Sequence, residues 1–145
     1  MRRVLRIVIV ALAGLLVLAQ FVPVDRTNPP VEGDVAAPPE VESALRTACY
    51  DCHSNETTWP WYGHVAPVSW LLAYDVSAGR EELNFSSWQN DDARRRQKKQ
   101  KEIVETLGEG EMPPWYYLAM HPDARRADLQ LIRRWAEASA DSAQP

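Results

Sequence analysis

The distribution of apolar and polar positions along the chain predicts a set of helices. Three stretches, beginning near residues 39, 67 and 124, repeat apolar residues every three or four positions, which places them on one face of an α-helix. A further helix is expected from the acidic pair at 91–92 to Leu107. Because no strand–helix alternation appears, we predict an all-α fold. The apolar faces comprise Val41, Leu45 and Ala48; Val68, Leu71, Leu72 and Val76; Ile103, Val104 and Leu107; and Leu129, Leu131, Ile132, Trp135 and Ala136.

Residues 1–22 combine a basic start with an apolar run from Ile7 to Ala19. This pattern is typical of an export signal or an N-terminal membrane anchor. Counted from Val4 to Val22, the segment is long enough to cross a bilayer, and no small-residue cleavage site follows it. We therefore expect an N-terminal membrane helix in a bacterial inner membrane, with the rest of the chain in the periplasm; a cleaved signal is the alternative.

The segment 23–39 is rich in proline and predicts an extended tether that acts as a plain linker. Apart from the N-terminal membrane helix, the expected helices fall within residues 40–140, which we interpret as one domain. The chain has a net charge of −4, and three of its basic residues precede any acidic one. The remainder is thus more acidic still, which argues against nucleic acid as a main partner.

A basic run, residues 94–101, lies in the first half of the helix expected after Asp92. We interpret it as a solvated helix face. A docking patch for an acidic redox partner or for anionic lipid headgroups is the alternative.

The two cysteines of the chain, Cys49 and Cys52, form a C-x-x-C pair that His53 follows directly. This is the attachment pattern of a c-type haem, in which two thiols bond the porphyrin and the adjacent imidazole binds the iron. A redox disulfide usually lies in a βαβ setting, and a closed zinc site needs four ligands, whereas the chain has no second C-x-x-C or H-x-x-x-H pair. We therefore predict one covalently attached haem c, with His53 as the proximal iron ligand.

Met112 is the preferred candidate for the second axial ligand of the iron. It lies between Gly110 and two prolines, so its thioether is expected on a stiff, extended loop. A Met/His pair raises the reduction potential of a haem. Met120 is another candidate, His64 or His121 would give a bis-histidine haem, and a five-coordinate iron is the remaining alternative.

The chain has six tryptophans and five tyrosines, which is many for 145 residues. We expect Trp59, Trp61, Tyr62 and Trp115 to be buried against the haem, although aromatic residues also pack ordinary cores. A docking surface is the alternative interpretation of the cluster at 59–62.

These motifs resemble those of the c-type cytochrome group, and more closely those of a family of small bacterial haem-binding-domain proteins. The resemblance covers most of residues 46–122 and is carried by the runs at 49–57, 59–62, 66–70, 83–86 and 111–116. It implies a cytochrome c-like helical bundle around the haem. It also implies thioether bonds at Cys49 and Cys52, His53 as the proximal ligand and Met112 as the distal one.

The expected function is electron transfer by a membrane-tethered cytochrome outside the cytoplasm. In such a carrier the protein sets the potential, orientation and access of the iron, and a redox partner protein is required, which the sequence does not specify. The alternative is a haem-dependent peroxidase-like enzyme or a small-molecule sensor with an open distal site. There His64 or His121 would serve as the acid–base group.

Overall fold

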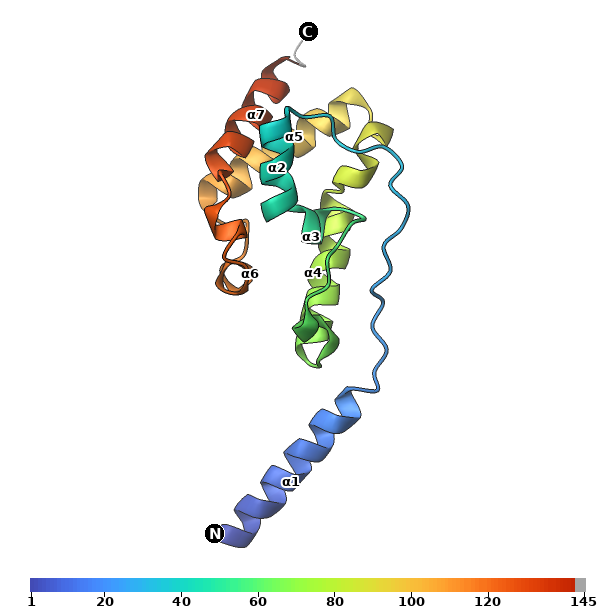
Figure 1. The fold of residues 1–145 in the computed structure, drawn as a ribbon, viewed down its shortest axis with the longest axis vertical. Coiled ribbons are helices and arrows are strands. Elements are labelled where there is room, and N and C mark those ends of the chain that lie inside the picture. The colour runs from blue at the N-terminus through green and yellow to red at the C-terminus, as the bar shows by residue number, and fades with distance from the viewer. Residues whose placement is uncertain (143–145) are drawn as a thin grey trace.

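The computed structural model describes residues 1–142, which form helices and loops and contain no strand (Figure 1). The predicted all-α fold is therefore confirmed over this range. The α-helices are α1 (Arg2–Ala19), α2 (Pro39–Ala48), α3 (Tyr50–His53), α4 (Val68–Glu82), α5 (Ala93–Glu109), α6 (Trp115–Met120) and α7 (Leu129–Ser142); the 3₁₀ turns are η1 (Trp61–His64), η2 (Phe85–Asn90) and η3 (Ala124–Arg126).

Helices α5 and α7 pack against each other, and α2 lies against α7 (Figure 1). Helix α3 follows α2 directly and packs against α4, which runs down one side of the molecule. Helix α6 lies on the opposite side, below α5 and α7, while α1 projects away from all the other helices.

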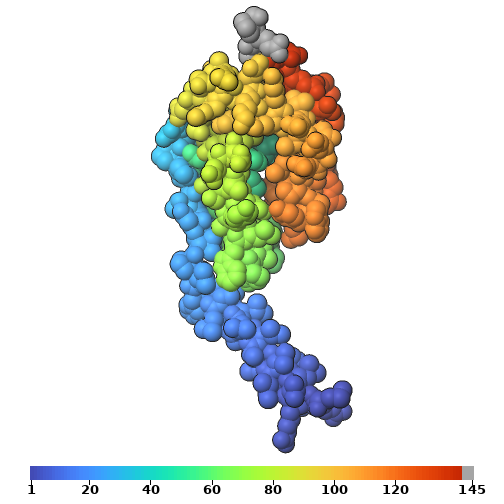
Figure 2. Space-filling model, turned by 180° about the vertical axis from the view of Figure 1, so that it is seen from behind, coloured from blue at the N-terminus to red at the C-terminus, as the bar shows by residue number. Residues whose placement is uncertain are grey.

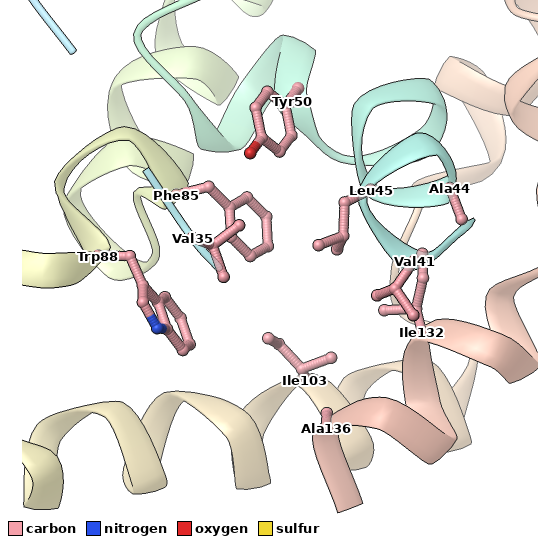
Figure 3. Close-up of a cluster of buried hydrophobic side chains, with 10 residues drawn as sticks. All are labelled: Val35, Val41, Ala44, Leu45, Tyr50, Phe85, Trp88, Ile103, Ile132 and Ala136. Atoms are coloured by element: carbon pink, nitrogen blue, oxygen red, sulfur yellow. The ribbon is translucent and has the colours of Figure 1, made fainter. Parts of the chain in front are cut away.

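The hydrophobic core lies where α2, α3, η2, α5 and α7 meet (Figure 3). Leu45 and Ile132 are 0% exposed and Phe85 is 1% exposed. The Phe85 ring stacks on Tyr50 at 5.4 Å and on Trp88 at 5.9 Å between ring centroids. These rings join the α3 turn and η2 to the helices, so the start of the attachment motif is fixed from inside the core.

The segment 23–38 is extended, as predicted, but the interpretation as a plain linker is wrong. The Asn28 side chain donates to the Thr57 carbonyl at 3.0 Å, and the Asn55 side chain donates to the Pro30 carbonyl at 2.8 Å. Val35 is 6% exposed and belongs to the core. The segment therefore packs along the domain, as Figure 1 shows for its upper part.

Helix α1 buries none of its side chains. Across residues 1–142, no helix combines the length and the apolar character that crossing a membrane requires. The expected membrane-spanning N-terminal helix is thus not supported. At the end of α1, Gln20 forms two hydrogen bonds with the backbone of Ala66, at 2.9 and 3.2 Å.

Several helix boundaries differ from those predicted. Gly79 is a glycine that could end the helix beginning near residue 67, but α4 continues past it to Glu82. Two residues of its expected buried face, Val68 and Leu71, are 39% and 45% exposed. Helix α5 extends to Glu109 rather than ending at Leu107, and Gly110, whose φ of 73° lies in the left-handed region, caps it. The last predicted helix divides into η3 and α7.

Candidate functional site

A cavity of about 590 Å³ lies between two walls of the molecule. One wall consists of α3 and α4, and the other of residues 112–121 with part of α5. Figure 2 shows the cavity from outside, as a cleft between α4 in yellow-green and the orange atoms that lead into α6. The volume lies in the range of pockets that hold cofactors and other small molecules.

The attachment motif forms a single turn directly after α2. The amides of Cys52 and His53 both donate to the Cys49 carbonyl, at 3.2 and 2.9 Å. Both cysteines are free thiols, and both line the cavity together with His53. The three residues of the predicted attachment motif therefore line the same cavity.

The His53 ring is fixed by the backbone of α4 and of the residue after it. Its Nδ1 lies 2.9 Å from the Gly79 carbonyl oxygen and 3.0 Å from that of Leu83, so Nδ1 carries the proton and donates it. Burial lowers the pKa of His53 more than these hydrogen bonds raise it, which keeps the imidazole neutral. Within the described chain Nε2 has no hydrogen bond, so its lone pair is available to a metal.

Gly79 allows α4 to approach the attachment turn closely. A Cβ atom at this position would lie 2.6 Å from the Cys52 carbonyl oxygen, closer than real Cβ contacts occur. Any side chain here would push α4 away from α3. The hydrogen bond between His53 and the Gly79 carbonyl therefore depends on the missing side chain.

The cysteine thiols are protonated at neutral pH. Burial, aided by the neighbouring Cys52, raises the pKa of Cys49 to about 12. Burial also raises the pKa of Cys52 to about 12, with smaller contributions from Asp75 and Asp51. Among residues 1–142, no group of three His, Cys, Asp or Glu side chains could hold a metal ion. The zinc alternative thus finds no support among these residues.

Met112 lines the cavity opposite the attachment turn and is 40% exposed. Met120 also lines it and is 55% exposed. His121 lines the cavity too, but its Nδ1 donates to the Tyr117 carbonyl at 2.9 Å and its Nε2 accepts from the Tyr62 hydroxyl at 3.2 Å. His64 is exposed and does not line the cavity. Neither nitrogen of His121 is therefore free to bind a metal.

Two of the four predicted aromatic residues line the cavity. Trp59 and Tyr62 lie in its wall, whereas Trp61 is 77% exposed and Trp115 is 80% exposed. The predicted burial of Trp61 and Trp115 is wrong. Each packs edge-on against the tyrosine that follows it and leaves that tyrosine facing the cavity.

Four polar residues in the cavity wall were not predicted from the sequence. The Tyr117 hydroxyl donates to Asp51 at 2.9 Å, and the Tyr116 hydroxyl donates to Asp75 at 3.1 Å. All four residues line the cavity. Asp51 lies inside the C-x-x-C pair, and the tyrosines follow Met-Pro-Pro-Trp, but no local pattern indicates that these distant residues pair.

Residues 14–138 match the family model of the haem-binding domain. The chain belongs to the haem-binding domain family. The matched range begins inside α1 and includes the segment 23–38 and every residue around the cavity. The protein is therefore a haem-binding protein. No curated protein and no solved structure matches the chain.

The cavity residues fit a haem. The lining is largely apolar, His53 presents a neutral imidazole with a free nitrogen, and two thiols and a thioether share the space. In the same wall, the buried indole N–H of Trp59 has no hydrogen-bond partner among residues 1–142. Buried donors of this kind are rare and usually mark a partner that the protein itself does not supply.

Proposed function

We propose that the protein is a c-type cytochrome that carries electrons outside the cytoplasm. The observation that carries this proposal is the meeting of Cys49, Cys52, His53 and Met112 around one cavity. Met112 lies far from the other three in the sequence and comes from the opposite wall. Its thioether shares the apolar space with the two thiols and with the free nitrogen of His53, and its place between a helix end and two prolines is unusual for a residue that only fills a gap.

Each residue has a distinct role in this proposal. Cys49 and Cys52 would hold the porphyrin as thioethers, His53 would bind the iron through Nε2, and the Met112 thioether would bind it from the other side. The bound iron supplies one-electron exchange. The hydrogen bonds from His53 Nδ1 to the Gly79 and Leu83 carbonyls orient the ring and increase its basicity as a ligand.

The proposed location outside the cytoplasm rests on the N-terminal segment and on the cysteines. Residues 1–22 combine three arginines with an apolar run, which supports export of the chain. Covalent haem attachment, like disulfide formation, is typical of exported proteins. A redox partner protein outside the cytoplasm is part of the same proposal.

The Met112→Ala variant tests the proposed ligand pair, with Met120→Ala as a matched control from the same cavity. We expect Met112→Ala to change the oxidised and reduced absorption spectra towards a five-coordinate iron and to lower the reduction potential. Met120→Ala should leave both unchanged. An unchanged spectrum in Met112→Ala, or the same change in Met120→Ala alone, would contradict the assignment of Met112.

A second candidate function is the reduction of peroxide or the binding of a small gas. It is favoured by His121, which lines the cavity with its Nε2 in contact with the Tyr62 hydroxyl, an arrangement that can hold a proton near a ligand. Carbon monoxide binding and peroxide turnover by the wild-type protein distinguish the two functions. A closed electron carrier binds carbon monoxide poorly and turns over little peroxide.

A further inference from the structure

We propose that two tyrosine–carboxylate hydrogen bonds, Tyr117 to Asp51 and Tyr116 to Asp75, clamp α6 across the cavity and thereby hold Met112 on the iron. The inference rests on the proposed function, because it assumes that Met112 is the distal ligand. It assigns positioning roles to four residues that are neither the proposed thioether attachment points nor the proposed iron ligands.

Helix α6 is not held in place by core packing. None of its residues is buried, and none belongs to the hydrophobic core. The Arg125 guanidinium donates to the Leu118 carbonyl at 2.8 and 3.2 Å, but Arg125 is only seven residues away and lies in η3, which is not part of the opposite wall of the cavity. We therefore infer that side-chain contacts across the cavity fix α6 relative to the opposite wall. One such contact lies at the end of α6, where His121 Nε2 accepts from the Tyr62 hydroxyl at 3.2 Å; the two tyrosine–carboxylate bonds hold the helix itself.

The first link joins α6 to the attachment turn. The Tyr117 hydroxyl donates to Asp51 Oδ2 at 2.9 Å, and Asp51 Oδ1 accepts from the Thr58 amide at 3.2 Å. Asp51 lies between the two cysteines, so its backbone is fixed by the same turn that presents them. A displacement of α6 therefore breaks a hydrogen bond to the motif itself.

The second link joins α6 to α4. The Tyr116 hydroxyl donates to Asp75 Oδ2 at 3.1 Å. Because Asp51 lies on α3 and Asp75 on α4, the two hydroxyls attach α6 to both elements of the opposite wall. Hydrogen bonds to ionised carboxylates are stronger than those between neutral groups, which suits them to bridge an open cavity.

Met112 is coupled to α6 by a short, stiff connection. Only Pro113 and Pro114 separate it from Trp115, and the ring of each proline fixes its φ angle. Pro113 is buried, and the Pro114 carbonyl accepts the Leu118 amide at 3.1 Å in the first turn of α6. A movement of α6 is therefore transmitted to the Met112 thioether.

The test uses the haem-loaded protein and removes single hydroxyls. In Tyr117→Phe and Tyr116→Phe the rings remain, and Tyr74→Phe is the control, because Tyr74 is 71% exposed and its hydroxyl has no hydrogen bond within the described chain. The readouts are the affinity of the oxidised protein for added imidazole, which competes with methionine for the iron, and the reduction potential. Circular dichroism checks that each variant keeps its helices.

We expect each of the two Phe variants to bind imidazole about tenfold more tightly than the wild type, because one charge-assisted hydrogen bond no longer holds the bound position of Met112. The double variant should show a larger change and a lower potential, and Tyr74→Phe should show none. Asp51→Asn keeps an acceptor oxygen but loses the charge. It should bind imidazole more tightly than the wild type, but less tightly than Tyr117→Phe. The comparison with the wild type provides the test if a tyrosine variant fails to fold.

The outcomes separate this inference from the proposed function. If Met112→Ala alters the spectrum but the Phe variants bind imidazole like the wild type, the clamp is wrong and the ligand assignment stands. If Met112→Ala leaves the spectrum unchanged, the ligand assignment fails, and the clamp fails with it.

Discussion

The imidazole of His53 is oriented by the polypeptide alone. Two backbone carbonyls accept its Nδ1 proton, and burial keeps the ring neutral. The close approach that these bonds need explains why a residue without a side chain, Gly79, faces the turn. The orientation of the His53 ring thus depends on its two hydrogen bonds and on the close approach of Gly79 to the turn, not on the motif spacing alone.

Replacement of Gly79 by alanine should disturb the site and destabilise the protein. The added Cβ would meet the Cys52 carbonyl oxygen at 2.6 Å, so α4 must shift, and we expect a cost of about 1–3 kcal/mol in the free energy of unfolding. Urea denaturation of the haem-loaded protein measures it. Gly108→Ala is the control, since its nearest contact is an ordinary 3.7 Å, and it should be neutral or stabilise by up to about 1 kcal/mol. Equal effects at both glycines would contradict the close packing at Gly79.

At this scale the sequence predicts chemistry better than orientation. The spacing of Cys49, Cys52 and His53 leads directly to the cavity in which they lie, and so does the unusual setting of Met112. The exposed positions of Trp61 and Trp115 were not predictable, because an aromatic cluster does not show which ring faces inwards. The tyrosine–carboxylate pairs were missed because their partners are far apart in the chain.

At the scale of elements, helix starts follow from local chemistry where a side chain caps them. Asp92 accepts the Arg95 amide at 2.7 Å and starts α5 close to the predicted position. Asp128 accepts the Leu131 amide at 2.9 Å, and this second cap separates η3 from α7 where one continuous helix was predicted. Helix α6 was not predicted, because the two prolines after Met112 indicated an extended loop, whereas proline also favours the start of a helix.

Removal of the α5 cap should lower the stability of the protein. Asp92→Ala deprives the Arg95 amide of its acceptor, so we expect a loss of about 1 kcal/mol in the free energy of unfolding. Asp92→Asn keeps an acceptor oxygen and should lose much less. Urea denaturation of the two variants distinguishes the cap from a general effect of charge, and an equal loss in both would contradict the capping role.

The extended segment 23–38 should be released from the domain when Arg80 is replaced by lysine. The Arg80 guanidinium donates to the Thr27 carbonyl at 3.0 Å, to Asn28 Oδ1 at 2.7 Å and to the Ser54 carbonyl at 2.7 Å. An ammonium group cannot form this fork. We expect faster tryptic cleavage after Arg26 in Arg80→Lys than in the wild type.

The control for this experiment is Arg134→Lys, because Arg134 is exposed and has one long ion pair of 3.9 Å. Its cleavage rate after Arg26 should match that of the wild type. A wild-type rate in Arg80→Lys would show that the segment is held by its other contacts, which include the buried side chain of Val35.

At the scale of the whole molecule, the cavity lies beside the hydrophobic core and shares part of its wall with it. Leu45 and Ile132 belong both to the core and to the cavity wall, so the packing of α2 and α7 also shapes the binding site. The sequence predicted the helices but not this arrangement, since the two walls come from segments that no local pattern connects. The packed position of 23–38 was missed for the same reason.

Truncation of Leu45 should test the dependence of the fold on this shared core. Leu45 is 0% exposed, so we expect Leu45→Ala to cost about 2–5 kcal/mol in the free energy of unfolding. Leu71→Ala removes the same atoms from a side chain that is 45% exposed and should cost well under half as much. Urea denaturation of both variants measures the difference, and similar losses would contradict the position of the core.

The central claim is that one haem is bound covalently through Cys49 and Cys52. The most direct measurement is the intact mass of the denatured protein after export in cells that mature c-type cytochromes. We predict the mass of the polypeptide plus one haem, and the bare polypeptide mass when both cysteines are replaced by serine. A bare polypeptide mass in the wild-type protein, with a haem that acid and solvent extract, would contradict the claim.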